Sequence, residues 1–449
     1  MAHVVPDERD IADRLDRLPV TVLHVAIVAL CALGFAFDTL EVALGSVLAA
    51  VFSAPHHAAS AQQLSLLLAS MYVGAAIGAP LLGRLADRYG RRRVIAALLL
   101  WLALTSLGAS ASGDLNGLTI FRALSGLAIG AYPPIVIAYL TDLLPPRRRG
   151  MLIFVMVAFA TVGPVAGVFL VRWLTPLQPL GIDAWRWGFV AGGVGAAFVA
   201  ILFRLLPESP RWLRARGHHA DAESELRRFE CSVAMATPAA VGWHGADTAQ
   251  PSANAKHVRQ SQGMRTWPVI AVLFFLSPWA TVAFPLLSGA VLVHKGFKLT
   301  DTLLYVALSY FGPLIGTLLA ALVVDRIERR MTLACCAAAM LVSGLVFAVG
   351  QSPPALVVSS LVFLLFASIF VPAINLYGAE LFKTGSRAAM VAGAWSLNRV
   401  GAALAPLVLV PLLHDGGAMA MFLVIAATLL GSVAVLAVAP RGRQQRAVE

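Results

Sequence analysis

The chain has 449 residues, of which 59% are hydrophobic and only 13% are charged, and its formal net charge is +11 at pH 7. These proportions exclude a globular protein and predict a polytopic membrane protein. The positive charge does not indicate nucleic-acid binding, because most lysines and arginines fall in segments on one side of the expected membrane. Short basic loops stay in the cytoplasm, so the charge indicates topology and favours anionic lipid headgroups as neighbours.

Apolar runs of spanning length, about 20 residues each, follow a polar stretch at residues 1–19. The first run is too long for the core of a signal peptide, so no cleaved signal is expected. The expected helices occupy residues 20–51, 62–83, 94–112, 116–143, 151–173, 185–206, 267–293, 301–324, 331–350, 355–379, 388–413 and 417–440. The pattern predicts an all-α membrane protein with twelve transmembrane helices in two pseudo-symmetric six-helix bundles.

The two bundles are expected at 20–206 and 266–440, with a polar segment at 207–265 between them. Near its start, Ser209 is a plausible helix cap with a proline directly after it, which predicts a short helix along the cytoplasmic surface. Its later part, 231–265, is rich in Ala, Ser, Gln and Gly without a period and predicts a mobile linker. The tails, 1–19 and 441–449, are both expected in the cytoplasm.

The stretch from Gly83 to Arg93 contains five arginines and one aspartate between two apolar runs. Because so charged a segment cannot lie in hydrocarbon, we expect a tight turn at the cytoplasmic membrane face. A shift of 238 positions places this stretch and its surroundings on matching residues of the second half. The matches are Asp87 with Asp325, Arg88 with Arg326, Arg91 with Arg329, Asp142 with Glu380, Arg149 with Arg387, and Tyr72 with Tyr310. The chain is therefore a duplicated membrane unit.

Two parallel repeats joined by a long loop are typical of a transporter whose halves rock about a site near the membrane midplane. The chain resembles the major facilitator superfamily over essentially its whole length, and 83–93 is similar to that superfamily's signature between helices 2 and 3. Residues 139–150 and 207–213 resemble the branch of sugar porters and organic-anion symporters. The second copy of the signature departs from the pattern, with Ala321 and Glu328 in place of its glycines.

The acids of the matched pairs lie near arginines, and their duplication favours ion pairs that latch the outward-open state at the cytoplasmic side. Structural turns are the alternative. The gate residues expected on this interpretation are Asp87, Arg88, Arg91, Asp142, Arg149, Asp325, Arg326, Arg329, Glu380 and Arg387.

Ionisable residues inside apolar helices are costly, at about 2.5–3.5 kcal/mol each at the bilayer centre on insertion scales. Asp38 and Glu41 share a face of the first helix, and Arg122 lies in the fourth at a depth that matches Asp38. Arginine stays protonated, so proton coupling falls to the carboxylates. Arg122 nearby would favour the charged form of Asp38, and burial would favour the neutral form. The alternative is a static ion pair between the two helices.

Arg399 lies in the eleventh helix, with Trp395 one turn earlier on the same face and Asn398 beside it. A buried arginine needs a partner, which is an acid of another helix, a backbone carbonyl or a substrate carboxylate. A guanidinium binds a carboxylate in a bidentate manner, and an indole suits a flat ring. The pair therefore favours a site for an aromatic acid, with a structural arginine as the alternative.

Family resemblance supports the same substrate class. Residues 37–42 are similar to the helix-1 motif of nicotinate-type and related metabolite:proton symporters, and 396–406 resemble helix 11 of aromatic acid:proton symporters. Phe35 replaces an acid usual in the aromatic-acid carriers, which favours the nicotinate-like branch. Tyr72 and Tyr310 either pack or contact substrate, and Asn375 either lines the cavity or bonds a neighbouring helix.

The sequence shows no nucleotide-binding loop and no catalytic constellation, so we expect neither an ATP-driven pump nor an enzyme. We also expect no cofactor and no metal, since the four cysteines fit no metal-ligand spacing. The predicted function is proton-coupled uptake of a small organic anion, an aromatic carboxylate such as nicotinate or a benzoate, by a monomer in a bacterial inner membrane. The alternatives are a proton-driven efflux antiporter and a sugar:proton symporter.

Overall fold

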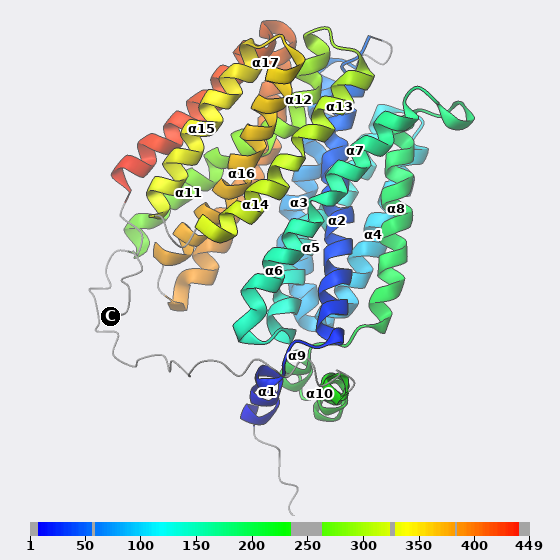
Figure 1. Ribbon diagram of the computed structural model, residues 1–449, viewed down its shortest axis with the longest axis vertical. Coiled ribbons are helices and arrows are strands. Elements are labelled where there is room, and N and C mark those ends of the chain that lie inside the picture. Colours follow the sequence, from blue (N-terminus) through cyan, green and yellow to red (C-terminus); the bar gives the residue numbers. More distant parts are fainter. Residues whose placement is uncertain (1–7, 56–58, 235–262, 324–327, 382–383, 440–449) are drawn as a thin grey trace, which may run out of the picture.

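The computed structural model describes residues 8–55, 59–234, 263–323, 328–381 and 384–439, and these ranges are helical with no β-strand among them (Figure 1). The first half contains α2 (Val22–Val51), α3 (Ala61–Tyr89), α4 (Arg91–Ala111), α5 (Leu115–Leu143), α6 (Pro146–Ala160), α7 (Val162–Leu174) and α8 (Ala184–Leu202). The second half contains α11 (Gly263–Thr281), α12 (Ala283–His294), α13 (Leu299–Ser309), α14 (Phe311–Val323), α15 (Arg329–Val349), α16 (Pro353–Leu381) and α17 (Thr384–Val438).

Several transmembrane spans contain a break, so the labelled helices outnumber the spans. The described residues contain eleven helical segments that are long and apolar enough to cross a membrane, with α6–α7, α11–α12 and α13–α14 each forming one segment. The last segment contains Gly417 with φ 72° and ψ −173°, where two helices meet. A left-handed φ suits glycine, because it has no Cβ to clash. Twelve transmembrane helices in two six-helix bundles therefore form the fold, which confirms the predicted fold class.

Large apolar side chains cover the outside of the helices. Leu104, Val342 and Ile201 are each at least 60% exposed, although they lie within apolar helices. Such a belt would be a liability in water, and it suits contact with lipid, where only helices and closed barrels satisfy their backbone.

Small residues bring α3 and α5 into close contact. A Cβ built on Gly74 or Gly78 of α3 would collide with the α5 backbone at Ala123 or Leu127, and one on Gly126 would collide with Met71. Helices in a membrane associate through such close backbone approach, because lipid gives no hydrophobic force between them. The α3–α5 pair is therefore a fixed part of the first half.

The two halves meet along α2, which packs on α12, and along α3, which packs on α17. The contacts of α2 lie in its last third: the Ser46 hydroxyl is 3.3 Å from the Tyr310 hydroxyl, and a Cβ on Gly289 of α12 would lie 3.0 Å from the Ser46 carbonyl oxygen. In Figure 1 the ribbons of the halves approach at this end and diverge toward the end that carries α9 and α10.

A basic end is formed by α1 (Glu8–Arg17), η2 (Phe203–Leu205), α9 (Pro210–Ala215) and α10 (His219–Ala234), together with the turns between α3 and α4 and between α5 and α6. The Ser209 side chain accepts a hydrogen bond from the Trp212 amide and caps α9, as the sequence predicts. The helix α1 lies within the stretch expected only as a polar tail, and α10 extends to Ala234. The rest of the predicted linker, 235–262, lies outside the described residues.

Candidate functional site

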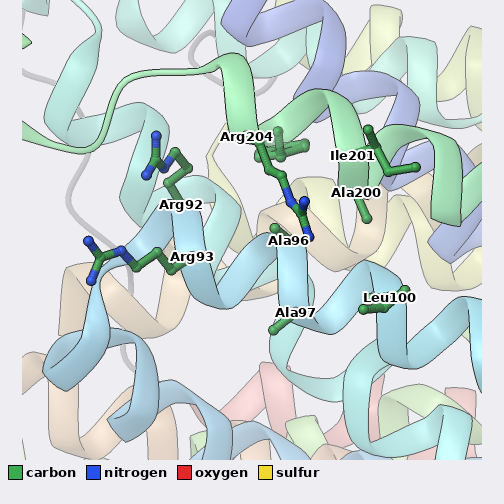
Figure 2. Close-up of a pocket in the computed structure, with 9 residues that line it drawn as sticks. Arg92, Arg93, Ala96, Ala97, Leu100, Ala200, Ile201 and Arg204 are labelled. Carbon is green, nitrogen blue, oxygen red and sulfur yellow. The ribbon is translucent and has the colours of Figure 1, made fainter.

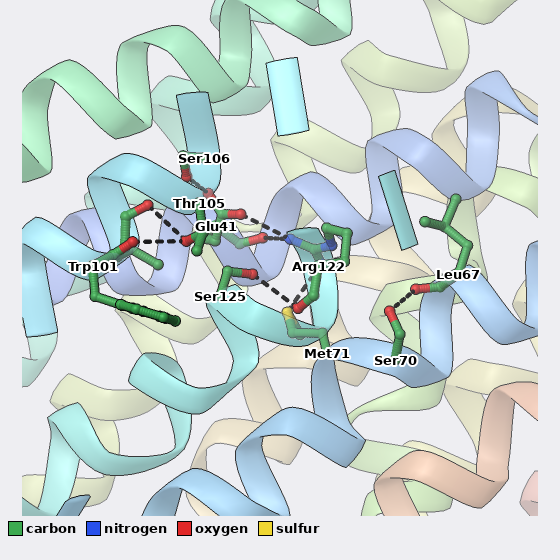
Figure 3. Close-up of polar contacts among 10 residues, drawn as sticks. Glu41, Leu67, Ser70, Met71, Trp101, Thr105, Ser106, Arg122 and Ser125 are labelled. Atoms are coloured by element: carbon green, nitrogen blue, oxygen red, sulfur yellow. Dashed lines mark hydrogen bonds and ion pairs between the residues drawn. The ribbon is translucent and has the colours of Figure 1, made fainter. Parts of the chain in front are cut away.

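A buried ion pair joins α2 to α5 inside the first half (Figure 3). Arg122 Nη1 lies 3.1 Å from Glu41 Oε1 and donates a hydrogen bond of 2.9 Å to the Glu41 carbonyl oxygen. Both side chains are 1% exposed. The Ser106 hydroxyl donates to Glu41 Oε2 at 2.5 Å, and Arg122 Nη2 lies 3.0 Å from Met71 Sδ. Each polar side-chain atom of Glu41 and Arg122 thus has a partner, except Arg122 Nε.

This pairing differs from the expected one between Arg122 and Asp38. The reason lies one turn beyond Glu41, at Gly45, where a Cβ would lie 3.2 Å from Arg122 Nη2. The missing side chain leaves room for the guanidinium at the level of Glu41, one turn away from Asp38. Phe189 covers the guanidinium, with its ring centroid 5.7 Å from Arg122 Cζ. Glu41, and not Asp38, is therefore the ion-pair partner of Arg122 in this structure.

Asp38 interacts electrostatically with Arg399 of α17, across the boundary between the halves, although the two side chains form no direct ion pair. Asp38 is 3% exposed, yet its Oδ1 has no hydrogen-bond partner among the described residues, and the same holds for Arg399 Nε. A buried polar atom without a partner costs free energy, and structures rarely keep one without a use. The interface between the halves therefore holds one anion and one cation with unused hydrogen-bonding capacity.

Two tyrosines related by the internal repeat lie close to this pair. Tyr72 of α3 is buried and interacts electrostatically with Arg399 and with Tyr310, which follows α13. The Tyr310 hydroxyl in turn lies 3.3 Å from the Ser46 hydroxyl of α2. The structure thus brings the two predicted tyrosines close to one another at the meeting of the halves.

The residues predicted for the eleventh transmembrane helix lie in α17 and make two kinds of contact. The guanidinium of Arg399 lies over the Trp395 ring, 5.2 Å from its centroid, and Phe274 of α11 meets that ring edge-on at 5.9 Å. Asn398 donates to the Phe274 carbonyl oxygen at 3.2 Å and to the Ser277 hydroxyl at 2.9 Å, so its amide holds α17 against α11.

Asn375 of α16, the remaining residue of the predicted substrate set, donates to the Val371 carbonyl oxygen of its own helix. That bond joins Asn375 to neither a neighbouring helix nor the Asp38–Arg399 pair.

Sequence reasoning missed Tyr132 of α5. Its ring is 6.2 Å from that of Phe35, its hydroxyl has no partner among the described residues, and it interacts electrostatically with Asp38. Gly34 of α2 makes room for it, since a Cβ there would collide with the hydroxyl. The signal in the sequence was a tyrosine directly before two prolines inside a spanning helix, where backbone groups need unusual partners.

The expected gate residues lie at the basic end. Arg91 and Asp142 form an ion pair within the first half, and Asp142 Oδ2 also accepts a hydrogen bond of 2.9 Å from the Ser209 hydroxyl. The Asp87 carbonyl oxygen accepts bonds from Trp212 and Arg216, and Arg149 Nη2 lies 3.9 Å from an Asp16 oxygen.

Of the other gate residues, Arg88 lies over the ring of Tyr89, and Arg329 is the first residue of α15. Asp325 and Arg326 lie outside the described residues, as do the side chains of Glu380 and Arg387. The latch that these residues would form in another state therefore stays a proposal.

The chemistry open to the interface follows from its groups. A guanidinium with an unused N–H binds a carboxylate, an indole beside it offers a flat apolar face, and a carboxylate opposite competes for the same cation or binds a proton. Among the described residues no group of three His, Cys, Asp or Glu side chains is placed to hold a metal ion.

Known proteins with a similar sequence or structure are transporters. Residues 24–440 match the family described as "Sugar (and other) transporter". The putative metabolite transport protein YyaJ of Bacillus subtilis is 26% identical over 393 residues, which cover 86% of each chain. The niacin transporter NiaP of Acinetobacter baylyi is 23% identical over 447 residues, which cover 98% of this chain and 99% of NiaP.

A solved structure shares the fold. The partially occluded inward-open conformation of the xylose transporter XylE from E. coli matches with a TM-score of 0.72 at 17% identity, covering 93% of this chain and 98% of XylE. This likeness supports the major facilitator fold, and the family match covers nearly all of the chain. The chain belongs to the sugar (and other) transporter family of the major facilitator superfamily, whose members are membrane transporters.

Proposed function

We propose that the protein is a symporter that takes up a small aromatic carboxylate together with a proton. The observation that carries this proposal is the pair of Asp38 and Arg399 at the boundary of the halves, each with an atom that has no hydrogen-bond partner. Trp395 under the guanidinium supplies the flat surface that an aromatic ring needs. Arg399 holds the carboxylate and Trp395 the ring, while Asp38 carries the proton.

Competition for one cation couples the two substrates. In the empty site Asp38 is the anion that balances Arg399, and the pair has no net charge. A substrate carboxylate that binds Arg399 would leave two anions beside one cation in a buried place, which is costly. If Asp38 takes up a proton at that moment, the site is neutral again. The expected stoichiometry is therefore one proton for each monocarboxylate.

Glu41 and Arg122 have a different part in this mechanism. Their charges already balance each other, and their hydrogen bonds are made to residues of the first half. We assign them the task of fixing α2 against α5, so that Asp38 keeps its place on the inner face. Tyr72, Tyr310 and Tyr132 offer hydroxyl groups to a bound anion or to the proton.

The end that carries α9 and α10 is assigned to the cytoplasm, since basic loops stay on that side. On this assignment the ribbons of the halves approach at the outer side and diverge toward the inner side (Figure 1), and we propose an inward-facing state for this arrangement. The outward-facing state would require the gate charges of the basic end, including Asp87 and Asp142, to join the two halves.

The similarity to NiaP over nearly the full length supports the substrate class, because niacin is a pyridine carboxylate. The direct test is uptake of labelled nicotinate, 4-hydroxybenzoate and xylose into proteoliposomes, with and without an inward proton gradient. We expect one of the two acids to accumulate above equilibrium only with the gradient, and xylose not to accumulate.

The matched variants are Arg399→Lys, which keeps the charge but loses the fork, and Arg399→Ala. We expect Arg399→Ala to abolish uptake and Arg399→Lys to lower it by at least tenfold. Accumulation of xylose and of neither acid would instead establish a sugar symporter. Export of a substrate against its gradient, driven by protons, would establish an antiporter.

A further inference from the structure

A groove with three arginines opens on the outer surface of the first half, at its basic end. It has a volume of about 350 Å³ and lies between the start of α4 and the end of α8 with η2 (Figure 2). Arg92 and Arg93 extend from α4, and Arg204 of η2 reaches down beside Ala96. The nine lining residues include no acid: Arg92, Arg93, Ala96, Ala97, Leu100, Ala200, Ile201, Phe203 and Arg204.

Two of the three guanidinium groups have no partner among the residues that the structure describes. Arg93 and Arg204 are exposed, and in the part of the chain that the structure describes neither has a hydrogen bond or an ion pair. Arg92 donates through Nη1 to the Leu206 carbonyl oxygen at 2.8 Å, which holds it against the end of the sixth span. The groove thus has a fixed cation at its back and two unpaired ones at its mouth.

The far wall of the groove is apolar and faces away from the protein. Leu100 is 48% exposed and lies about two turns from Arg93, and Ile201 is 61% exposed and lies about one turn from Arg204, both within spanning segments. A ligand that fits this surface needs an anionic group at the level of the arginines and an apolar chain along the helices. A phospholipid at the edge of the bilayer has both.

The internal repeat supplies a matching groove without the charges. In the second half a groove of about 320 Å³ lies at the start of α15 and is lined by Glu328, Arg330, Met331 and Ala334, with Val433, Leu436 and Ala437 of α17. The shift of 238 positions relates Arg92 to Arg330, Ala96 to Ala334 and Arg93 to Met331. Arg330 also donates to a carbonyl oxygen of the last span, that of Ala437, at 3.0 Å.

The charges of the two grooves differ while their shapes correspond. Glu328 balances Arg330 among the residues that line the second groove, whereas the lining of the first carries three positive charges. We propose that the first groove binds the phosphate headgroup of an anionic phospholipid between Arg93 and Arg204, with an acyl chain on Leu100 and Ile201. The second groove has the space for a lipid and lacks the charge that selects an anionic one.

Native mass spectrometry of the full-length protein in detergent tests this proposal, with dioleoylphosphatidylglycerol or dioleoylphosphatidylcholine added at equal ratios. We expect one phosphatidylglycerol to be retained in preference to phosphatidylcholine. The double variant Arg93→Gln with Arg204→Gln should lower the apparent affinity about 25-fold, since each arginine near anionic headgroups contributes about a factor of five. The matched control Arg330→Gln should leave this affinity unchanged.

A gain of binding gives an independent test, because it does not depend on removing charges. Glu328→Gln with Met331→Arg should add a second retained phosphatidylglycerol; Met331 is 60% exposed, so the change leaves the core intact. Equal retention of the two lipids by the unmodified protein, or an unchanged affinity in the double arginine variant, would overturn the proposal. Full displacement of the lipid by an equal concentration of inorganic phosphate would also overturn it, by assigning the groove to free anions.

Discussion

Removing the charge of Glu41 should destabilise the first half strongly, whereas removing the charge of Asp38 should not. Glu41 and Arg122 are each 1% exposed and are bound to one another, to Ser106 and to Met71. In Glu41→Gln the guanidinium of Arg122 stays buried with no anion. Breaking a buried ion pair in this way costs about 3–5 kcal/mol. For a unit of this size, a loss of about 3 kcal/mol lowers the melting temperature by about 6–12 °C.

The chain offers its own reporters for this measurement. Cys31 of α2 and Cys336 of α15 are buried, one in each half, while Cys231 and Cys335 are exposed. A thiol-reactive fluorescent dye in a background of Cys231→Ser, Cys335→Ser and Cys336→Ser then follows the unfolding of the first half through Cys31 alone. The same background with Cys336 restored and Cys31 replaced by Ser follows the second half.

Two further variants make the reasoning falsifiable. Glu41→Gln with Arg122→Gln removes both charges, so the double variant should lose less stability than the sum of the two single variants. Asp38→Asn leaves Arg399 without its balancing anion but breaks no direct ion pair, so its melting temperature should fall by less than that of Glu41→Gln. If Glu41→Gln melted within about 2 °C of the parent, or if the two single effects simply added, the assignment of a structural pair would be wrong.

Three other outcomes test the packing. Gly126→Val should prevent assembly of the first half, seen as loss of the monodisperse peak in size-exclusion chromatography, because a Cβ there meets the backbone of Met71; Gly83→Ala, which meets nothing within 4 Å, is the control. Asn398→Ala should lower the stability of the second half by about 1 kcal/mol, because it removes an interhelical hydrogen bond. Asn375→Ala is the control: the Asn375 amide bonds its own helix, so the same thermal assay should show no loss. Hydrogen bonds to Glu230 and Glu223 raise the pKa of Arg14, so its guanidinium keeps its proton and these bonds at every pH below the ordinary pKa of arginine. The contribution of these bonds to stability should therefore be constant from neutral to mildly alkaline pH. Amide hydrogen exchange in α10 should be faster in Arg14→Ala and unchanged in Arg17→Ala.

The fold was predictable from the sequence because its signals are long and repeated. Apolar runs of spanning length and a register of 238 positions predict twelve helices in two bundles, and the structure confirms both. Of the breaks inside spans, only that of the seventh helix was indicated by the sequence, through Pro278 and Pro285. At Thr161, Val282 and Tyr310 a spanning segment is divided without any interruption in its hydrophobicity. A proline follows each break by three residues, at Pro164, Pro285 and Pro313, and proline removes a backbone hydrogen bond of the helix, so the signal lies in these prolines and not in the hydropathy.

The sequence indicated the ionisable residues of the candidate site but not which of them lie together. Helix periodicity places Asp38 and Glu41 on one face, but the choice of partner depends on which neighbouring helix leaves room. Gly45 makes that room for Arg122 beside Glu41, and α17 brings Arg399 toward Asp38. Tyr132 entered the site only through the structure, since an isolated tyrosine in an apolar helix is also compatible with ordinary packing.

The most direct test of the proposed coupling compares two assays on Asp38→Asn, with labelled nicotinate as substrate. Without the carboxylate nothing competes for Arg399 and nothing carries the proton. The variant should therefore exchange internal for external nicotinate in counterflow, with a KM no higher than that of the parent, and should fail to accumulate nicotinate under an inward proton gradient. Gradient-driven accumulation by Asp38→Asn equal to that of the parent would contradict the assignment of Asp38 as the proton carrier.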